Sequence, residues 1–113
     1  MRIGEYNESL FRLYKSNKLD SCAYITACNP RGKRLSDALN AHRHDELGRE
    51  LRRRGLKFLQ GEGRHPVGNW PSEASYLILG LSLETAKILG KKYAQNAIVY
   101  CGSDAVPRLV LLR

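Results

Sequence analysis

The stretch Tyr24–Gly32, which reads Tyr-Ile-Thr-Ala-Cys-Asn-Pro-Arg-Gly, constrains the fold more than any other part of the chain. Apolar, β-favouring residues run directly into Asn29 and Pro30 there, and a helical pattern led by Ser36 begins a few residues later. Proline cannot donate a hydrogen bond to a sheet ladder. We therefore expect a strand to end at this corner and a helix to follow it.

Leucine spacing and capping residues predict three helices. The major helix follows the N-cap Ser36 and ends at Gly55, and its leucines recur every four residues or a multiple of four. These leucines are Leu35, Leu39, Leu47 and Leu51. A second long helix is predicted over Leu83–Tyr93 with Ser82 as its N-cap, and a short N-terminal helix over Asn7–Lys15.

The remaining apolar runs predict strands, which cover residues 22–28, 56–60, 76–81, 97–100 and 108–112. After the first helix the order is strand, helix, strand, strand, helix, strand, strand. The first six of these match the split βαβ, or ferredoxin-like, arrangement. Because crossovers are right-handed, both major helices fall on one face of the sheet. We expect an α+β sandwich with a mostly antiparallel sheet of about five strands, two major helices on one face and a short N-terminal helix.

The length and composition suit one compact domain. With 113 residues and 42% hydrophobic composition, the chain is large enough for one core. We expect a single domain over 1–113, with the N-terminal helix and its connector in 1–20 and the α/β core in 21–113. No apolar run approaches the roughly 20 residues that cross a bilayer, and the N-terminus lacks the apolar centre of a signal peptide. The expected location is the cytoplasm, and no membrane partner is expected.

The cysteines and histidines do not form a recognisable metal pattern. Cys22, Cys28 and Cys101 are odd in number, lie in apolar surroundings and lack Cys-x-x-Cys spacing, which predicts buried, reduced thiols. His42 and His44 lie two residues apart, so on a helix they point in different directions and are expected to face solvent. No metal and no cofactor are predicted.

The positive charge is concentrated around the major helix. The formal net charge is +8, which favours association with polyanions. One alternative function is therefore a nucleic-acid or protein interaction module that uses the basic face of this helix. Its residues are Arg49, Arg52, Arg53, Arg54 and Lys57. The simpler alternative is a solvated basic face. An RNA-binding sheet is disfavoured because the strand residues Ile25, Ala27, Leu77 and Leu79 offer no aromatic ring.

The predicted topology gathers polar residues at one rim of the sheet. The ends of the first two strands, the starts of the next two, the beginning of the major helix and the end of the last helix all meet there. The candidate ligand-binding residues are Asn29, Arg31, Asn40, Arg43, Glu62, His65, Trp70, Glu73 and Gln95. They form either a network that closes the end of the fold or a binding pocket. The long Gly- and Pro-rich segment 61–71 favours the pocket.

Three charged residues of this rim allow more than one interpretation. Arg43 falls on the same side of the major helix as its leucines. It is either a cation whose aliphatic stem covers the leucines, or a half-buried guanidinium held by a carboxylate. Glu62 and Glu73 either form an acid–base pair or each neutralise an arginine, and Arg43 is the natural partner of Glu62. Neutralisation is the preferred interpretation. Whether the chain is an enzyme stays open, and Glu62 is the first candidate for an acid or base.

An ordered set of short motifs resembles a known family. The motifs are Thr26-Ala-x-Asn-Pro30, Ser36 with Asn40 and Arg43, Gly61-Glu-Gly63, Trp70-Pro-x-Glu73-x-Ser75 and Gln95-Asn-Ala97. In their order and spacing they resemble a bacterial family catalogued as domain of unknown function 3293, over about Tyr24 to Leu112. The resemblance implies a small bacterial domain without an assigned activity or catalytic residue. It also implies that the rim is a shared feature of the family.

These observations together favour one function over its alternatives. The leading hypothesis is a protein that binds a small anionic or nucleotide-like ligand at the rim. Arg43 and Arg31 would supply positive charge. The side chains that would orient the ligand are Asn29, Asn40, Glu62 and Glu73.

Overall fold

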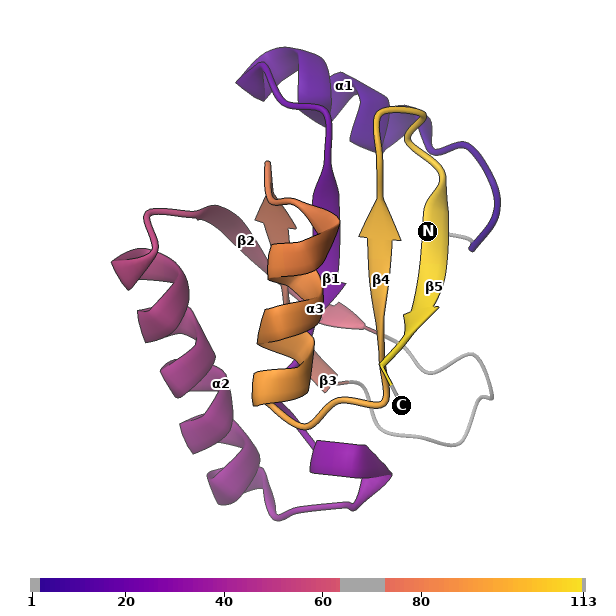
Figure 1. Cartoon of the computed structure of the whole chain (residues 1–113). Coiled ribbons are helices and arrows are strands. Elements are labelled where there is room, and N and C mark those ends of the chain that lie inside the picture. The colour runs from indigo at the N-terminus through magenta and orange to yellow at the C-terminus, as the bar shows by residue number, and fades with distance from the viewer. Residues whose placement is uncertain (1–2, 64–72, 113) are drawn as a thin grey trace.

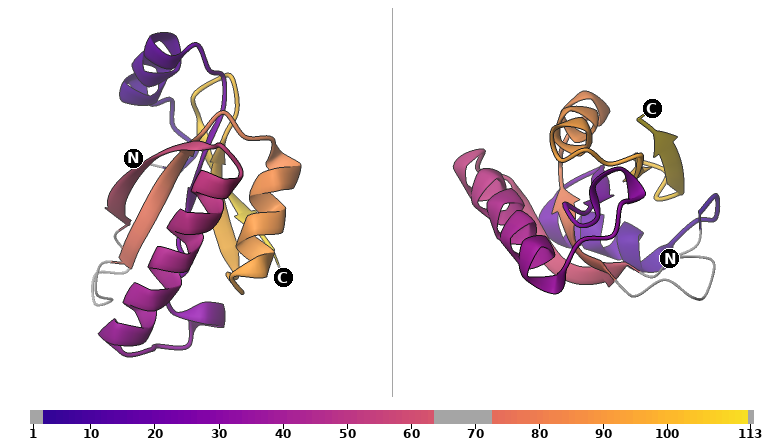
Figure 2. Two further views of the ribbon diagram at one scale, coloured as in Figure 1. Left: turned by 90° about the vertical axis from the view of Figure 1, so that its left-hand side faces the viewer. Right: turned by 90° about the horizontal axis from the view of Figure 1, so that it is seen from below.

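The computed structural model of the chain describes residues 3–63 and 73–112. In order, the elements are α1 (Glu8–Asn17), β1 (Cys22–Ile25), a 3₁₀ turn η1 (Pro30–Gly32), α2 (Asp37–Arg53), β2 (Lys57–Gly63), β3 (Glu73–Leu79), α3 (Leu83–Lys92), β4 (Ala97–Cys101) and β5 (Pro107–Leu111). Helices α2 and α3 cover one face of the sheet, and α1 lies near one end of the opposite face (Figures 1 and 2). Within the described ranges every helix is too short or too polar to span a bilayer.

The sheet has the strand order β2-β3-β1-β4-β5, and every neighbouring pair is antiparallel. Strand β1 lies at the centre, between β3 and β4, so β1 and β2 point in one direction and β3 and β4 in the other. This arrangement of the first four strands, with α2 and α3 on one face, is the split βαβ pattern, and β5 extends it beyond β4. The predicted α+β class is therefore confirmed.

Each helix begins at a side-chain cap. Oδ1 of Asn7 accepts a hydrogen bond from the N–H of Leu10 at 2.9 Å. Ser36 caps α2 and Ser82 caps α3, each through its Oγ atom, at 3.2 and 3.1 Å. Such caps satisfy backbone donors that have no partner within the helix. The predicted starts of the two long helices are confirmed.

Strand β1 ends at Ile25, three residues before the predicted end. Beyond it, Thr26 provides hydrogen bonds through its side chain. Its Oγ1 donates to the carbonyl of Ala74 at 2.7 Å and accepts from the N–H of Cys28 at 3.0 Å. The segment thus stays attached to β3 without a continuous backbone ladder.

The hairpin of β2 and β3 is longer than predicted. Its register continues past Gln60, which pairs with Tyr76, as far as Gly63, which pairs with Glu73. The glycines at the predicted end of β2 do not stop the strand, because the ladder with β3 supplies their backbone partners. The hairpin therefore reaches the same end of the sheet as the end of β1.

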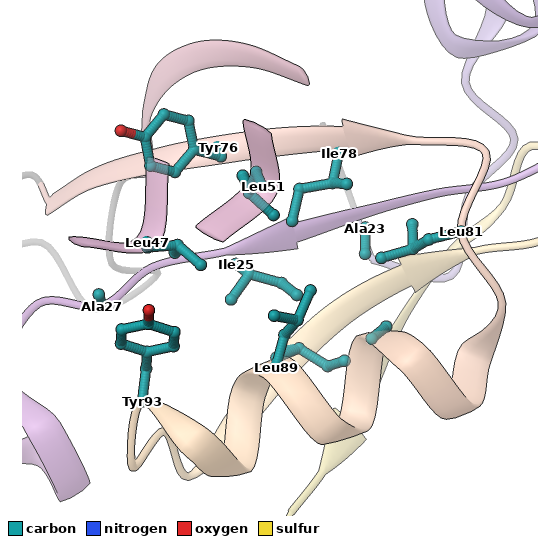
Figure 3. Packing of buried hydrophobic residues seen from close by; sticks show 12 residues of the cluster. Ala23, Ile25, Ala27, Leu47, Leu51, Tyr76, Ile78, Leu81, Leu89 and Tyr93 are labelled. Carbon is teal, nitrogen blue, oxygen red and sulfur yellow. The ribbon is translucent and has the colours of Figure 1, made fainter. Parts of the chain in front are cut away.

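The main core lies between the sheet and the two covering helices (Figure 3). Leu47 and Leu51 of α2 are fully buried there, as their spacing predicts. The prediction for Leu39 is wrong: this residue is 54% exposed, because the N-terminal turns of α2 extend beyond the end of the sheet (Figure 2). The cluster comprises Ala23, Ile25, Ala27, Leu47, Leu51, Tyr76, Ile78, Leu81, Ala86, Leu89, Tyr93 and Ile98.

A second cluster packs α1 against the opposite face of the sheet. It contains Leu10, Tyr14, Cys22, Leu77, Leu79, Cys101 and Ala105. The hydroxyl of Tyr14 donates to the carbonyls of Cys101 and Gly102 at 3.2 and 3.0 Å. All three cysteines are buried and free, which agrees with the predicted buried thiols.

Of the four strand residues used to disfavour an RNA-binding sheet, Leu77 and Leu79 lie on the face opposite α2 and α3. Ile25 and Ala27 lie under the helices, in the main core. Tyr24 is on the opposite face, in register with Leu77 and Val99. It is half-buried and packs against the α1 cluster. Sequence reasoning therefore missed the aromatic residue of the central strand.

Gly48 on α2 permits a close contact between this helix and β3. The Tyr76 hydroxyl donates to the carbonyl of His44 at 3.1 Å, and its ring stacks on the His44 ring with centroids 4.2 Å apart. A Cβ atom at Gly48 would collide with this hydroxyl. The glycine is therefore required by packing.

Gly48→Ala should lower the free energy of unfolding by about 1–3 kcal/mol, because overpacking outweighs the higher helix propensity of alanine. Urea denaturation measures the change. In a Tyr76→Phe background the cost should shrink, since the colliding oxygen is absent. Gly102→Ala is the control, because a Cβ there meets no atom within 4 Å. An alanine variant at position 48 as stable as the wild type would contradict this account.

Candidate functional site

Two asparagines fasten the strand-to-helix corner at the rim. Asn29 is 7% exposed and has a φ of +47°, a left-handed conformation that asparagine tolerates. Its N–H donates to Oδ1 of Asn40 at 2.9 Å, and Nδ2 of Asn40 donates back to Oδ1 of Asn29 at 2.9 Å. The same Asn29 oxygen accepts from the N–H of Leu35 at 2.9 Å. The reciprocal bonds connect the end of β1 to the first turns of α2.

Arg43 connects three elements through two backbone carbonyls. Its Nε donates to the carbonyl of Ala27, and its Nη2 donates to the carbonyl of Tyr93, both at 2.6 Å. The residue is half-buried. Among the described residues no carboxylate pairs with it. The guanidinium thus joins α2 to the residues that follow β1 and α3, a role that neither sequence interpretation had named.

Gln95, in the segment between α3 and β4, completes this group. It is buried, and its Nε2 donates to the carbonyls of Cys28 and Tyr93 at 3.0 and 3.1 Å. Nearby, the N–H of Arg31 donates to the carbonyl of Ala94 at 2.6 Å, while the Arg31 side chain is exposed. The structure therefore brings together four of the predicted residues, Asn29, Asn40, Arg43 and Gln95, which we call the rim network.

Other predicted rim residues are placed only in part. Glu62 pairs with Ala74, and Glu73 with Gly63, at the end of the β2–β3 hairpin where the connection between the two strands begins. Their backbone positions share the end of the sheet with the rim network, but their side chains lie outside the described part. His65 and Trp70 lie outside the described residues altogether. The carboxylate pair of Glu62 and Glu73 stays a prediction.

A buried carboxylate on α2 was not predicted as a site. Glu50 is 4% exposed. Its Oε1 accepts from the Tyr93 hydroxyl at 3.0 Å and pairs with Nζ of Lys92 at 2.8 Å, and its Oε2 pairs with Nε of Arg54 at 3.0 Å. The sequence feature that could have indicated its burial is its position next to Leu51, at the edge of the leucine-bearing side of the helix.

The environment of Glu50 changes two pKa values. Burial opposes ionisation of Glu50, but the hydrogen bonds from Lys92, Arg54 and Tyr93 outweigh it and hold the pKa of this carboxyl below its ordinary value. Burial, together with the nearby Glu50 carboxylate, raises the pKa of Tyr93 to about 12. At neutral pH the pair is therefore a charged acceptor and a neutral phenol donor.

The basic residues predicted as a nucleic-acid surface fall into two groups. Arg54 pairs with Glu50, and the guanidinium of Arg52 lies 5.6 Å from the ring centroid of Phe58. Arg49 and Arg53 are exposed and make no hydrogen bond or ion pair within the described part of the chain. Lys57 on β2 is likewise exposed. Arg52 and Arg54 thus have structural contacts, whereas Arg49 and Arg53 have none.

The two helix histidines differ in their surroundings. His42 is exposed and its Nε2 lies 2.7 Å from Oε1 of Glu46. The prediction for His44 is wrong: its ring stacks on Tyr76, because it lies one turn before Leu47 on the edge of the buried stripe. Its Nδ1 is buried without a hydrogen-bond partner in the described part. Among the same residues, no cluster of three His, Cys, Asp or Glu side chains could hold a metal ion.

Arg43→Ala should lower the free energy of unfolding by roughly 2–4 kcal/mol, because two charge-assisted hydrogen bonds are lost and two carbonyls lose a donor. Arg31→Ala is a matched control. It removes the same charge from the same rim, but the Arg31 contact to Ala94 is made by the backbone and survives. Chemical denaturation of both variants compares them. If the two variants were equally stable, the hydrogen bonds of Arg43 would not stabilise the fold.

Glu50→Gln should lower stability at neutral pH by removing the charge that Lys92 and Arg54 face. Because the folded-state pKa of Glu50 is lowered, its contribution is present above the ordinary glutamate pKa of 4.5 and is lost as pH falls below it. Stability curves of variant and wild type should therefore converge in acid. Glu84→Gln, at an exposed position on α3, serves as the control. A stability difference between variant and wild type that did not change with pH would contradict this role of the Glu50 carboxylate.

Comparison with known proteins identifies a family without a known function. The family model described as a protein of unknown function, DUF3293, matches residues 25–98, which is more than half of the chain and includes the whole rim network. No curated protein and no solved structure matches the chain. The chain therefore belongs to the DUF3293 family.

Proposed function

We propose that the protein binds a small anionic or nucleotide-like ligand at the rim, with Arg43 and Arg31 providing positive charge. The observation that carries this proposal is the state of the Arg43 guanidinium. It is half-buried and held by two carbonyls, and no carboxylate whose side chain the structure describes pairs with it. A cation removed from water is normally paired. Carbonyl dipoles orient this one without cancelling its charge, so an anion would meet a preoriented donor.

The surroundings of Arg43 support the proposal. The side chains of Arg31, Lys33 and Arg34 are exposed at the same corner, and no ion pair neutralises them within the described part. The rim network holds the corner at fixed positions, so little conformational entropy would be lost when a ligand binds. The proposal assigns orientation of the ligand to Asn29, Asn40, Glu62, Glu73 and Gln95. It keeps His65 and Trp70, which lie outside the described residues, as further candidates.

Thermal-shift measurements with nucleotides and with phosphorylated or carboxylated metabolites test the proposal. A ligand that binds only the folded state raises the melting temperature. Arg31→Ala should reduce this rise while leaving the melting temperature of the free protein unchanged, since its side chain has no structural contact. Lys91→Ala, an equal loss of charge on α3, should leave the rise intact.

The opposite result would assign the rim a structural role only. If no compound raises the melting temperature, while Arg43→Ala lowers stability, the rim network serves to close the end of the fold. The same conclusion follows if Arg31→Ala and Lys91→Ala reduce the ligand effect equally, because the effect would then reflect net charge and no particular site.

A further inference from the structure

A groove of about 280 Å³ lies between α2 and α3. Its walls are Glu46, Arg49, Glu50 and Arg53 from α2, and Lys92 and Tyr93 at the end of α3. None of the four rim-network residues lines it. Tyr93 separates the two regions, because its carbonyl accepts from Arg43 whereas its hydroxyl donates to Glu50. We call this region the helix groove.

On the inner wall of the helix groove, the Glu50 carboxylate is neutralised by two cations. Glu50 accepts from Tyr93 and pairs with Lys92 and Arg54, so both of its oxygens have partners. A buried carboxylate held by two cations does not repel an incoming anion as a free carboxylate would. Oε1 of the other acidic residue, Glu46, lies 2.7 Å from Nε2 of His42, a contact that is an ion pair only when this histidine is protonated.

Two arginines on the α2 wall are not neutralised. Arg49 and Arg53 lie one helical turn apart, so they project from the same side of α2. Both are exposed, and neither makes an ion pair with Glu46 or Glu50, although the helix spacing would allow it. The positive charge of Arg53 reaches the Tyr93 hydroxyl, whose pKa it lowers slightly against the larger effects of burial and Glu50. The groove therefore has an excess of positive charge.

Stabilisation of the helix ends does not account for this arrangement. Cations near the C-terminus of a helix interact favourably with its dipole, but the effect is confined to the last turn and amounts to about 0.3–1 kcal/mol per residue. It explains Arg53 and Lys92, which lie in the last turns of α2 and α3. It does not explain Arg49, which precedes the last turn of α2 and still faces the groove.

We propose that the helix groove binds phosphate groups of a polynucleotide backbone. Arginine presents planar paired donors that match phosphate oxygens, and Arg49 and Arg53 offer two such groups opposite Lys92. The groove follows about two turns of α2, from Glu46 to Arg53, which suits successive phosphates of an extended chain. The formal net charge of +8 favours a long polyanion.

Fluorescence anisotropy with labelled single-stranded and duplex oligonucleotides tests this proposal. The double variant Arg49→Ala/Arg53→Ala should bind at least about tenfold more weakly at low salt, because two phosphate contacts are lost. The slope of log affinity against log salt should become shallower by about 1.5. Both side chains are exposed and make no hydrogen bond or ion pair within the described part of the chain. Circular dichroism should therefore match the wild type, and the melting temperature should fall only by the small contribution of Arg53 to the helix end.

Arg31→Ala/Arg34→Ala is the matched control, because it removes the same charge from the rim. It should retain most of the oligonucleotide affinity, whereas it should lose the small-ligand effect proposed for the rim. The two proposals therefore fail separately. Equal weakening by both double variants, unchanged binding by the groove variant, or no binding by the wild type would each overturn the groove assignment.

A second measurement uses inorganic phosphate as the ligand. Phosphate alone could stabilise the protein against heat, with this effect lost in Arg49→Ala/Arg53→Ala, while no oligonucleotide binds. That result would show that the groove binds phosphate from a source other than a polynucleotide. Competition of phosphate with a bound oligonucleotide, lost in the same variant, would support it.

Discussion

The guanidinium of Arg43 connects chain segments that meet at the rim. Its two hydrogen bonds, to the carbonyls of Ala27 and Tyr93, connect the exit from β1 with the exit from α3. Buried carbonyls need donors, and the strand and helix hydrogen bonds end before these positions. A flexible cation with several N–H groups can serve both carbonyls from α2. The position of α2 over the sheet thus depends on one side chain as well as on the leucines beneath it.

Tyr93 makes the two polar regions of the molecule interdependent. Its carbonyl accepts from Arg43 and Gln95, and its hydroxyl donates to the buried Glu50. A change that shifts this residue alters the rim network and the helix groove together. Effects of substitutions in such a shared network are not additive. Separating the functions of the two regions therefore requires substitution of exposed residues such as Arg31 and Arg49, whose side chains do not contact Tyr93 through a hydrogen bond.

The sequence predicts the architecture well because each element carries its own local signal. The caps at Ser36 and Ser82 and the buried Leu47 follow from helix periodicity. The early end of β1 was missed because Thr26 replaces ladder hydrogen bonds with side-chain bonds. Leu39 was placed wrongly because periodicity does not reveal where the sheet below a helix ends.

The candidate site could be predicted as a location but not as a set of contacts. Topology alone brings Asn29, Asn40, Arg43 and Gln95 to one end of the sheet. Their partners are mostly backbone carbonyls and N–H groups, which leave no trace in side-chain patterns.

Sequence reasoning looked for carboxylate partners of Arg43 and so overlooked Glu50, whose partners come from a different helix as well as its own. The region matched by the family, residues 25–98, contains both polar regions, whereas α1, β5 and most of β1 and β4 lie outside it. Helix α1 covers the far face of the sheet, on the side opposite α2 and α3, and contributes no residue to the rim network or the helix groove. Both proposals place their sites within the matched region.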